Sequence, residues 1–312
     1  MPTTAPGSAR PRWRRVAGRG VWTLFVVALA AAAGLVLGPA QRSEPPPSAE
    51  QLRRHFEASL RWMKVHEERV LADGNPMLWR MVRDAAALSG DATLSDMVRR
   101  HRERYFTRAP VDAWVLMLDP AATPSAALPS GLARLPEYMK LMAYGLTCDG
   151  ALGATEVVSR QLRPNYCSTF AARRVLRQSK CATHQLAGVM LMAQRGCGDP
   201  ARVAALTQAL QDRVVEELSL DFVVRDEHLQ RVLMLYWTGA PERVKPVWLN
   251  RLLRAQQPDG GWFYEADLSG WLPGRAPPAS TDFHATAQGL LVIAMALQQG
   301  EAALGRAPQN RP

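Results

Sequence analysis

The 312-residue sequence lacks several patterns that would assign it to a common functional class. It has no C-x-x-C pair, which disfavours a structural zinc site. Alternation of apolar and polar residues is missing, with 111–118 as the nearest candidate strand, and this argues against a β-rich fold. Beyond residue 20 no basic run is interleaved with aromatic residues, so we expect no nucleic-acid partner.

The N-terminal region predicts a membrane anchor. Residues 1–20 contain five arginines and no acidic residue, which accounts for half of the net charge of +10. Residues 21–38 carry no charge and as a helix would span about 27 Å, close to the hydrocarbon thickness of a bilayer. The preceding arginines predict a single pass through the inner (cytoplasmic) membrane, with the N-terminus in the cytoplasm and the main domain periplasmic or extracellular. A cleaved signal peptide is the alternative, since Gly38 and Ala40 are small.

The rest of the chain predicts an extended linker followed by one helical domain. Residues 39–48 include three successive prolines, which favour a semi-rigid spacer. Residues 49–303 show apolar residues at helical spacing, broken by short Gly, Pro, Ser and Asp clusters, and residues 304–312 predict a disordered tail. About twelve helices are expected, over 49–72, 77–88, 92–106, 134–147, 151–162, 168–179, 182–195, 200–219, 226–238, 242–256 and 282–299.

A weak internal repeat indicates how these helices are arranged. Three segments begin at His184, His228 and His284, spaced by 44 and 56 residues, and each has an apolar pair at its seventh and eighth positions. A related segment begins at Glu137. Periods of this length are typical of stacked helix pairs. About six pairs would close into an α/α toroid, and an open solenoid of pairs is the alternative.

The same repeat predicts a candidate site. If the four segments are inner helices, the side chains that start them face the mouth of a central cavity. Neutral imidazoles beside a carboxylate can bind a metal or transfer protons, so His184, His228, His284 and Glu137 are the candidate catalytic residues. The alternative is that each histidine only caps a helix or bonds a turn.

The stretch from Gln256 to Trp262 reads Gln-Gln-Pro-Asp-Gly-Gly-Trp. It resembles the Q-x-x-D-G-x-W repeat of the terpenoid cyclase and protein prenyltransferase toroids, mainly over residues 251–299. The resemblance implies an all-α fold of the α/α-toroid type. It also implies structural roles for the turn residues Gln256 or Gln257, Asp259, Gly260, Gly261 and Trp262. The stretch 271–284 is similar to the end of a prenyltransferase β subunit, which implies a zinc ligand at His284.

The reactions of these families need motifs that the chain does not contain. It has no Asp-x-Cys for prenyl transfer, no Asp-x-Asp-Asp or Asp-Asp-x-x-Asp for terpenoid cyclisation, and no Gly-x-Cys-His for lanthionine formation. The resemblance therefore suggests an architecture and leaves the reaction open.

The four cysteines predict two disulfides if the domain lies in an oxidising compartment. A helix over 168–179 would place Cys167 and Cys181 too far apart to bond, and a helix over 182–195 would do the same for Cys181 and Cys197. We therefore expect the pairs Cys167–Cys197 and Cys148–Cys181. Four buried thiols in a cytosolic protein are the alternative.

Two functions stay open at this point. The missing motifs favour a ligand-binding or scaffold protein of the cell envelope, with a hydrophobic ligand, a glycan or an envelope protein as its partner and the membrane bound through residues 21–38. The alternative is an enzyme that acts on a lipid, isoprenoid or glycan in the cavity. The sequence specifies no cofactor.

Overall fold

The computed structural model describes residues 22, 25–31, 34, 42–107, 111–125, 128–167, 180–221, 223–265 and 280–303. In these ranges the regular elements are all helices, which confirms the predicted all-α class, and Trp262 and Asp282 form an isolated β-bridge. The helices of the domain are α2 (Ala49–Val65), α3 (Glu67–Ala72), α4 (Pro76–Ser89), α5 (Ala92–Phe106), η1 (Ala113–Met117), η2 (Leu132–Arg134), α6 (Glu137–Thr147), α7 (Gly150–Gly153), α8 (Glu156–Gln161), α10 (Cys181–Arg195), α11 (Pro200–Leu220), α12 (Asp226–Trp237), η4 (Pro241–Arg243), α13 (Pro246–Arg254) and α14 (Phe283–Ala303).

Several predicted segments lie outside the described residues. These are residues 1–20, 168–179 and 304–312, together with half of the predicted anchor. The other half of the anchor, residues 22, 25–31 and 34, is described and helical. No helix among the described residues is both long and apolar enough to cross a membrane.

Short polar side chains set the helix starts. Ser48, Asp91, Asp149 and Asp199 each accept a hydrogen bond from the backbone N–H three residues ahead, which satisfies one of the unpaired donors of a helix N-terminus. Thr155 does the same for α8, and it divides the expected helix 151–162 into α7 and α8.

Two other predicted segments differ from the structure. The candidate strand 111–118 contains η1, a 3₁₀ helix capped by Asp112. The expected helix 242–256 is η4 followed by α13, because Pro246 cannot continue a helix from the preceding turn and instead begins a new one.

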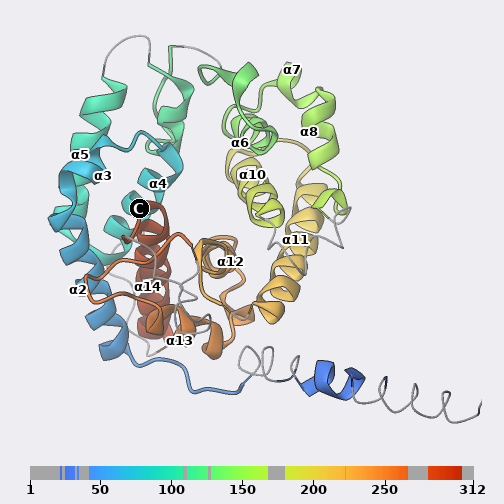
Figure 1. Ribbon diagram of the computed structural model, residues 1–312. Coiled ribbons are helices and arrows are strands. Elements are labelled where there is room, and N and C mark those ends of the chain that lie inside the picture. The colour runs from blue at the N-terminus through green and yellow to red at the C-terminus, as the bar shows by residue number, and fades with distance from the viewer. Residues whose placement is uncertain are drawn as a thin grey trace, which may run out of the picture.

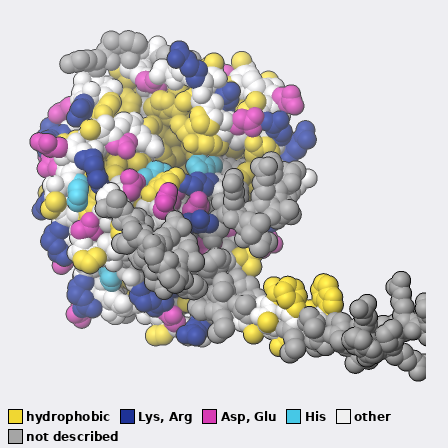
Figure 2. All heavy atoms as spheres, in the orientation of Figure 1, with side chains coloured by type: hydrophobic (Ala, Val, Ile, Leu, Met, Phe, Trp, Pro, Cys, Tyr) yellow, Lys and Arg dark blue, Asp and Glu magenta, His cyan; other side chains and the backbone are white. Residues whose placement is uncertain are grey.

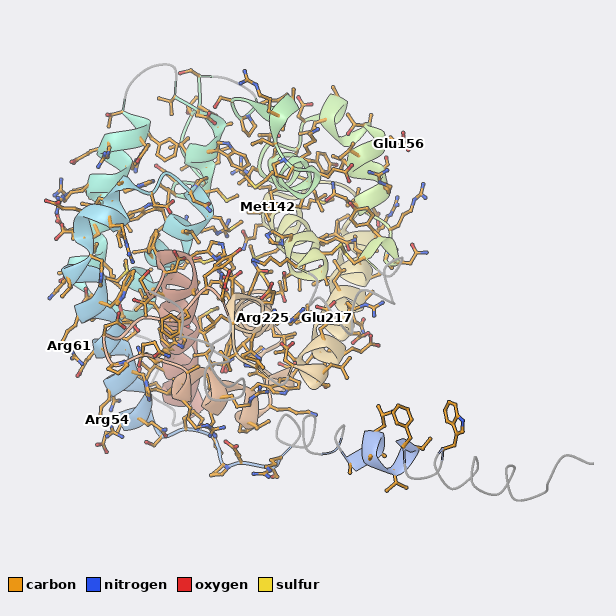
Figure 3. The ribbon with its side chains drawn as sticks, viewed as in Figure 1. Arg54, Arg61, Met142, Glu156, Glu217 and Arg225 are labelled. Carbon is orange, nitrogen blue, oxygen red and sulfur yellow. A yellow bond between two sulfur atoms is a disulfide. The ribbon has the colours of Figure 1, made fainter. Side chains whose placement is uncertain are left out.

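Five helices contact one another in succession, in the order α4, α14, α12, α10 and α6, and η1 contacts both α6 and α4. Other helices pack against this set: α2 packs on α14, α5 on α4, α8 on α6, α11 on α10 and α12, and α13 on α12. Figure 1 shows α12 near the centre, with α2, α3 and α5 on one side and α8 and α11 on the other. Figure 3 shows Arg54 and Arg61 on α2 and Glu156 on α8 at the outer edges, and all three are exposed.

The successive helices α4, α14, α12, α10 and α6 run in the same direction. At their N-terminal ends Trp79 of α4 lies 5.8 Å from Phe283 of α14, and Asp226 of α12 hydrogen bonds His284 of α14. At the start of α10, the Tyr138 ring of α6 lies 4.2 Å from the His184 ring. The helix starts therefore gather on one face of the domain.

Polar side chains in the first half and middle of α4 contact the C-terminal ends of α10 and α12. Arg80 of α4 donates to Gln194 of α10 at 2.5 Å and lies 5.3 Å from the ring centre of Trp237 on α12. The Trp237 indole donates to Asp84 at 2.9 Å. Burial lowers the pKa of Arg80 to about 10, so the guanidinium stays charged at neutral pH. These contacts link α4, α10 and α12 across the interior.

The turn after α13 fastens the end of the chain to its beginning. The Gln256 amide donates to the His55 carbonyl and to Ser59 Oγ, both at 3.0 Å, on α2. Asp259 accepts from the Gly261 N–H at 3.0 Å and from the Thr281 hydroxyl at 2.6 Å. Trp262 is buried, and its indole donates to the Leu252 carbonyl at 2.9 Å.

Among the described residues, the neighbouring Gln257 bonds only within the turn: its amide donates to the Ala255 carbonyl at 2.8 Å, and its backbone N–H donates to the Gly261 carbonyl. Gln256 is therefore the glutamine that reaches another helix.

The disulfides differ from the predicted pairs. The structure joins Cys148 to Cys197 and Cys167 to Cys181, with Cα separations of 5.2 and 5.6 Å. The prediction was wrong for Cys167 and Cys181 because it placed them at opposite ends of a straight helix; the residues between them lie outside the described part of the chain. Cys148 and Cys197 meet because α6 and α10 run in parallel, so their C-terminal ends coincide.

Candidate functional site

A cavity of about 340 Å³ lies where the helix starts gather. Its described lining comes from the starts of α6, α10 and α14, the end of α8, and the segments that precede α10 and α14: Glu137, Tyr138, Gln161, Tyr166, Lys180, Cys181, His184, Tyr264 and His284. Three of the four candidate residues, Glu137, His184 and His284, therefore lie on one cavity. On the face in Figure 2, hydrophobic side chains gather in a central hollow, and histidines lie at its edge.

A buried carboxylate orients His284. Asp226, the first residue of α12, has no exposed surface, and its Oδ1 lies 2.6 Å from His284 Nδ1 and 2.8 Å from the Gln288 amide nitrogen. A carboxylate only accepts hydrogen bonds, so Nδ1 carries a proton, and in the neutral form of the ring Nε2 keeps its lone pair. No described residue hydrogen bonds that Nε2. The pair therefore has the arrangement of a general base with its orienting acid.

Lys180 supplies a positive charge beside this pair. Its Nζ donates to Asp226 Oδ2 at 3.0 Å and to the Tyr264 hydroxyl, and it lies 4.2 Å from the Tyr264 ring centre. Burial raises the pKa of Asp226, but the hydrogen bond from His284 and the charge of Lys180 outweigh burial and hold the pKa below its ordinary value. Burial likewise lowers the pKa of Lys180, but the Tyr264 and Asp226 contacts outweigh it and raise the pKa. Both groups are thus ionised at neutral pH.

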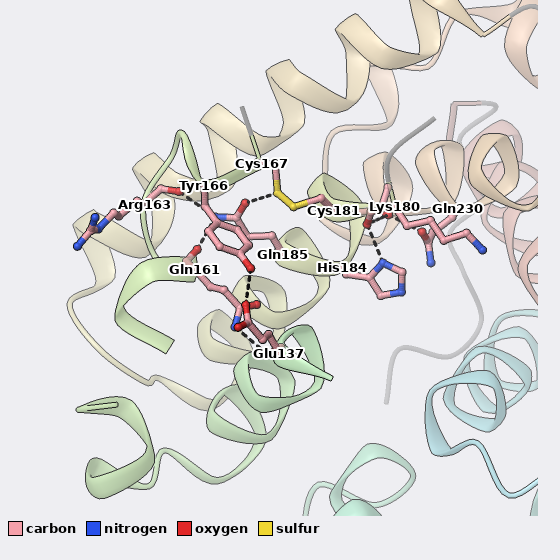
Figure 4. The surroundings of a disulfide bond; sticks show 11 residues. Glu137, Gln161, Arg163, Tyr166, Cys167, Lys180, Cys181, His184, Gln185 and Gln230 are labelled. Atoms are coloured by element: carbon pink, nitrogen blue, oxygen red, sulfur yellow. Dashed lines mark hydrogen bonds between the residues drawn. A yellow bond between two sulfur atoms is a disulfide. The ribbon is translucent and has the colours of Figure 1, made fainter. Parts of the chain in front are cut away.

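His184 presents a second imidazole to the cavity. Its Nδ1 donates to the Lys180 carbonyl at 2.6 Å, and its ring lies 4.2 Å from that of Tyr138. Burial lowers the pKa of His184, so the ring is neutral at neutral pH with its lone pair on Nε2. Figure 4 shows this bond next to the Cys167–Cys181 disulfide, which ties the start of α10 to the chain after α8.

The opposite wall is held by Glu137. Its carboxylate accepts from Arg160 at 2.6 Å and from the Tyr166 hydroxyl at 2.9 Å. The Arg160 hydrogen bond, together with that from Tyr166, lowers the pKa of Glu137. Glu137 is therefore an ionised, fixed group at neutral pH.

The fourth candidate, His228, lies elsewhere. It is fully buried, with Nε2 3.1 Å from the Trp248 carbonyl and Nδ1 3.4 Å from Asp221. Residues two apart on a helix point about 200° away from each other, so on α12 Asp226 faces the cavity side and His228 faces α13. His228 belongs to a buried network with Asp221, Arg231 and Glu217.

No role was predicted from the sequence for Asp226, Lys180, Tyr166 or Tyr264. Asp226 stands two residues before His228, but the repeat aligned the histidines and gave that aspartate no role. Tyr264 comes two residues after Trp262, at the end of the turn that follows α13. Tyr166 and Lys180 stand next to Cys167 and Cys181, which form a disulfide. All three side chains reach the same cavity because of the path of the loops between helices, which the sequence pattern does not predict.

The described residues hold no group of three or more His, Cys, Asp or Glu side chains placed to hold a metal ion. A larger cavity of about 700 Å³ lies between the end of α10, α11 and η4. The described residues that line it include neither histidine nor tyrosine, and its charged pair, Asp212 and Arg243, is a partly exposed ion pair. The smaller cavity, with its oriented imidazoles, is thus the candidate functional site.

No family model, curated protein or solved structure matches the chain.

Proposed function

We propose that this protein is an α/α toroid of the cell envelope, anchored through residues 21–38, whose cavity binds a glycan. The closed order of contacts from α4 through α14, α12, α10 and α6 to η1 supports a ring, in which η1 takes the place of a sixth inner helix. Two disulfides support an oxidising compartment, since such bonds rarely persist in the cytosol.

The observation that carries the proposal is the chemistry of the cavity lining. Tyr138 and Tyr264 are partly exposed aromatic rings, which can pack on the C–H face of a sugar. His184 and His284 offer Nε2 acceptors for hydroxyl groups, and Lys180 offers a donor. A volume of about 340 Å³ lies within the range of small-molecule sites. A polyol with alternating apolar and hydroxyl faces suits this set better than an isoprenoid, which would leave these polar groups unpaired.

The test is a screen of the purified full chain on a microarray of neutral and acidic glycans, followed by calorimetry on the strongest binder. We expect Tyr138→Ala and Tyr264→Ala to weaken binding at least about fivefold, because each removes a stacking surface worth about 1 kcal/mol or more. Tyr105→Ala is the matched control, since Tyr105 is similarly exposed and bonds the Ala72 carbonyl away from the cavity. Absence of glycan binding, or equal loss in all three variants, would contradict the proposal.

A further inference from the structure

The cavity contains groups that binding alone does not require. Asp226 is a fully buried carboxylate, and it is bonded on one oxygen by His284 and Gln288 and on the other by Lys180. Burying such a charge costs free energy unless several donors satisfy it. The His284 imidazole is therefore fixed in one tautomer on the wall of a cavity that the Lys180 ammonium group also lines.

We propose that this cavity hydrolyses an O-acyl ester on the bound saccharide, with His284 as the general base; the inference rests on the proposed glycan site. Asp226 is a positioning residue that fixes the tautomer and stabilises the imidazolium. Lys180 donates two hydrogen bonds to described residues, Asp226 and Tyr264, which leaves one N–H for a ligand oxygen.

The lining residues favour water as the nucleophile and an ester as the substrate. Cys181 is the lining side chain best suited to attack a carbonyl, and its sulfur is held in a disulfide. Hydrolysis of a glycosidic bond canonically uses a carboxylic acid as proton donor. Glu137 is ionised beside Arg160, and Asp226 is ionised beside Lys180, so neither supplies that proton.

The reaction balances with water alone. His284 Nε2 takes a proton from water as the oxygen attacks the ester carbonyl, and the Lys180 ammonium stabilises the oxyanion. The tetrahedral intermediate then breaks its bond to the sugar oxygen, which receives the proton from the imidazolium. The products are a carboxylic acid and a free sugar hydroxyl.

Acetate release from penta-O-acetylglucose by the full chain tests the inference. We expect His284→Ala to lower the rate at least about 100-fold and added imidazole to restore part of it, which a purely structural role would not produce. Asp226→Asn should lower kcat at least about tenfold with little change in KM. His66→Ala is the matched control, because His66 is also half-buried and bonds a backbone carbonyl, that of Trp62 at 3.0 Å.

The outcomes separate this inference from the proposed function. Glycan binding without acetate release by the wild-type protein would overturn the hydrolysis and leave the binding function standing. Equal rates in the wild type, His284→Ala and His66→Ala would show that the acetate comes from uncatalysed hydrolysis, and this would also contradict the proposed esterase activity. A chain that neither binds glycans nor releases acetate would overturn both. If His284→Ala fails to fold, His284→Gln takes its place, and full activity in that variant would overturn the inference.

Discussion

The His101 side chain makes the stability of the domain depend on pH. It is fully buried against Trp79, with ring centres 4.1 Å apart, and neither ring nitrogen bonds a described residue. Burial lowers the pKa of His101 from 6.5 to about 4. The neutral ring is therefore tolerated in the folded state, and the unfolded state takes up a proton first as the pH falls.

We expect the free energy of unfolding to fall by about 3 kcal/mol between pH 6.5 and 4 on account of this residue. Well above pH 6.5 the ring is neutral in both states and its contribution is fully present. His101→Phe keeps the stacking on Trp79 and removes the titrating group. The free energy of unfolding of the wild type should therefore fall relative to that of the variant as the pH is lowered from 6.5 to 4. Urea unfolding at a series of pH values measures it, and a difference independent of pH would contradict the prediction.

Gly260 is required by the turn that joins α13 to α2. Its φ is +95°, and an added Cβ would lie 2.1 Å from the Ala58 carbonyl oxygen. That oxygen belongs to the backbone of α2, so relieving the clash would require a shift of the helix. We expect Gly260→Ala to lower the free energy of unfolding by at least about 3 kcal/mol. Gly150→Ala is the control, because that position has open space, and it should change stability by less than about 1 kcal/mol. Equal effects in chemical denaturation would show that the turn tolerates a side chain.

At the scale of the element, the two disulfides should stabilise the domain unequally. They close loops of 49 and 14 residues, and chain entropy gives about 4 kcal/mol for the longer loop and about 3 for the shorter. We therefore expect the pair Cys148→Ser and Cys197→Ser to lower the melting temperature more than Cys167→Ser with Cys181→Ser. Peptide mapping without reduction should recover Cys148 joined to Cys197; recovery of Cys167 joined to Cys197 would contradict this structure.

The helices could be predicted from the sequence because their signals are local. Ser48, Asp91 and Asp199 stand at starts that the sequence predicted within about two residues, and each helix presents an apolar face to its neighbours. The split at Thr155 was missed because one hydroxyl bonding one N–H changes no apolar periodicity.

The site was only partly predictable, because it depends on which helices lie side by side. Glu137, His184 and His284 were found since each stands near the start of a helix on the same face. Asp226 could not be found in this way: its role comes from the contact of α12 with α14, which brings residues 58 positions apart within hydrogen-bond distance. His228 lies off the cavity because it stands two residues after Asp226 on α12, a rotation that a weak repeat does not resolve.

At the scale of the molecule, the linker is held against the domain. Glu44 forms a double hydrogen bond to Arg254 at 3.0 and 3.2 Å, and the Pro45 carbonyl accepts from Asn250 at 2.9 Å. The ion pair is partly exposed, so its contribution to global stability is under about 1 kcal/mol. Its effect should instead appear in the local mobility of residues 42–48.

We expect Asn250→Ala with Arg254→Ala to leave the melting temperature nearly unchanged and to speed trypsin cleavage after Arg42 several-fold. Arg53→Ala is the control, since its ion pair with Glu301 is also partly exposed and does not involve the linker. Cleavage at the wild-type rate in the double variant would show that prolines alone hold the segment.

The hydrogen bonds from Gln256 to α2 also have a consequence for folding during synthesis of the chain. Leu52, Trp62 and Met63 are buried in the finished domain, where α2 packs on α14 and bonds a turn about 200 residues later in the chain. A ribosome has therefore made most of the protein before the partners of its first domain helix exist. Until then these side chains are open to solvent or to a chaperone, and a chain that stops before residue 256 leaves them so.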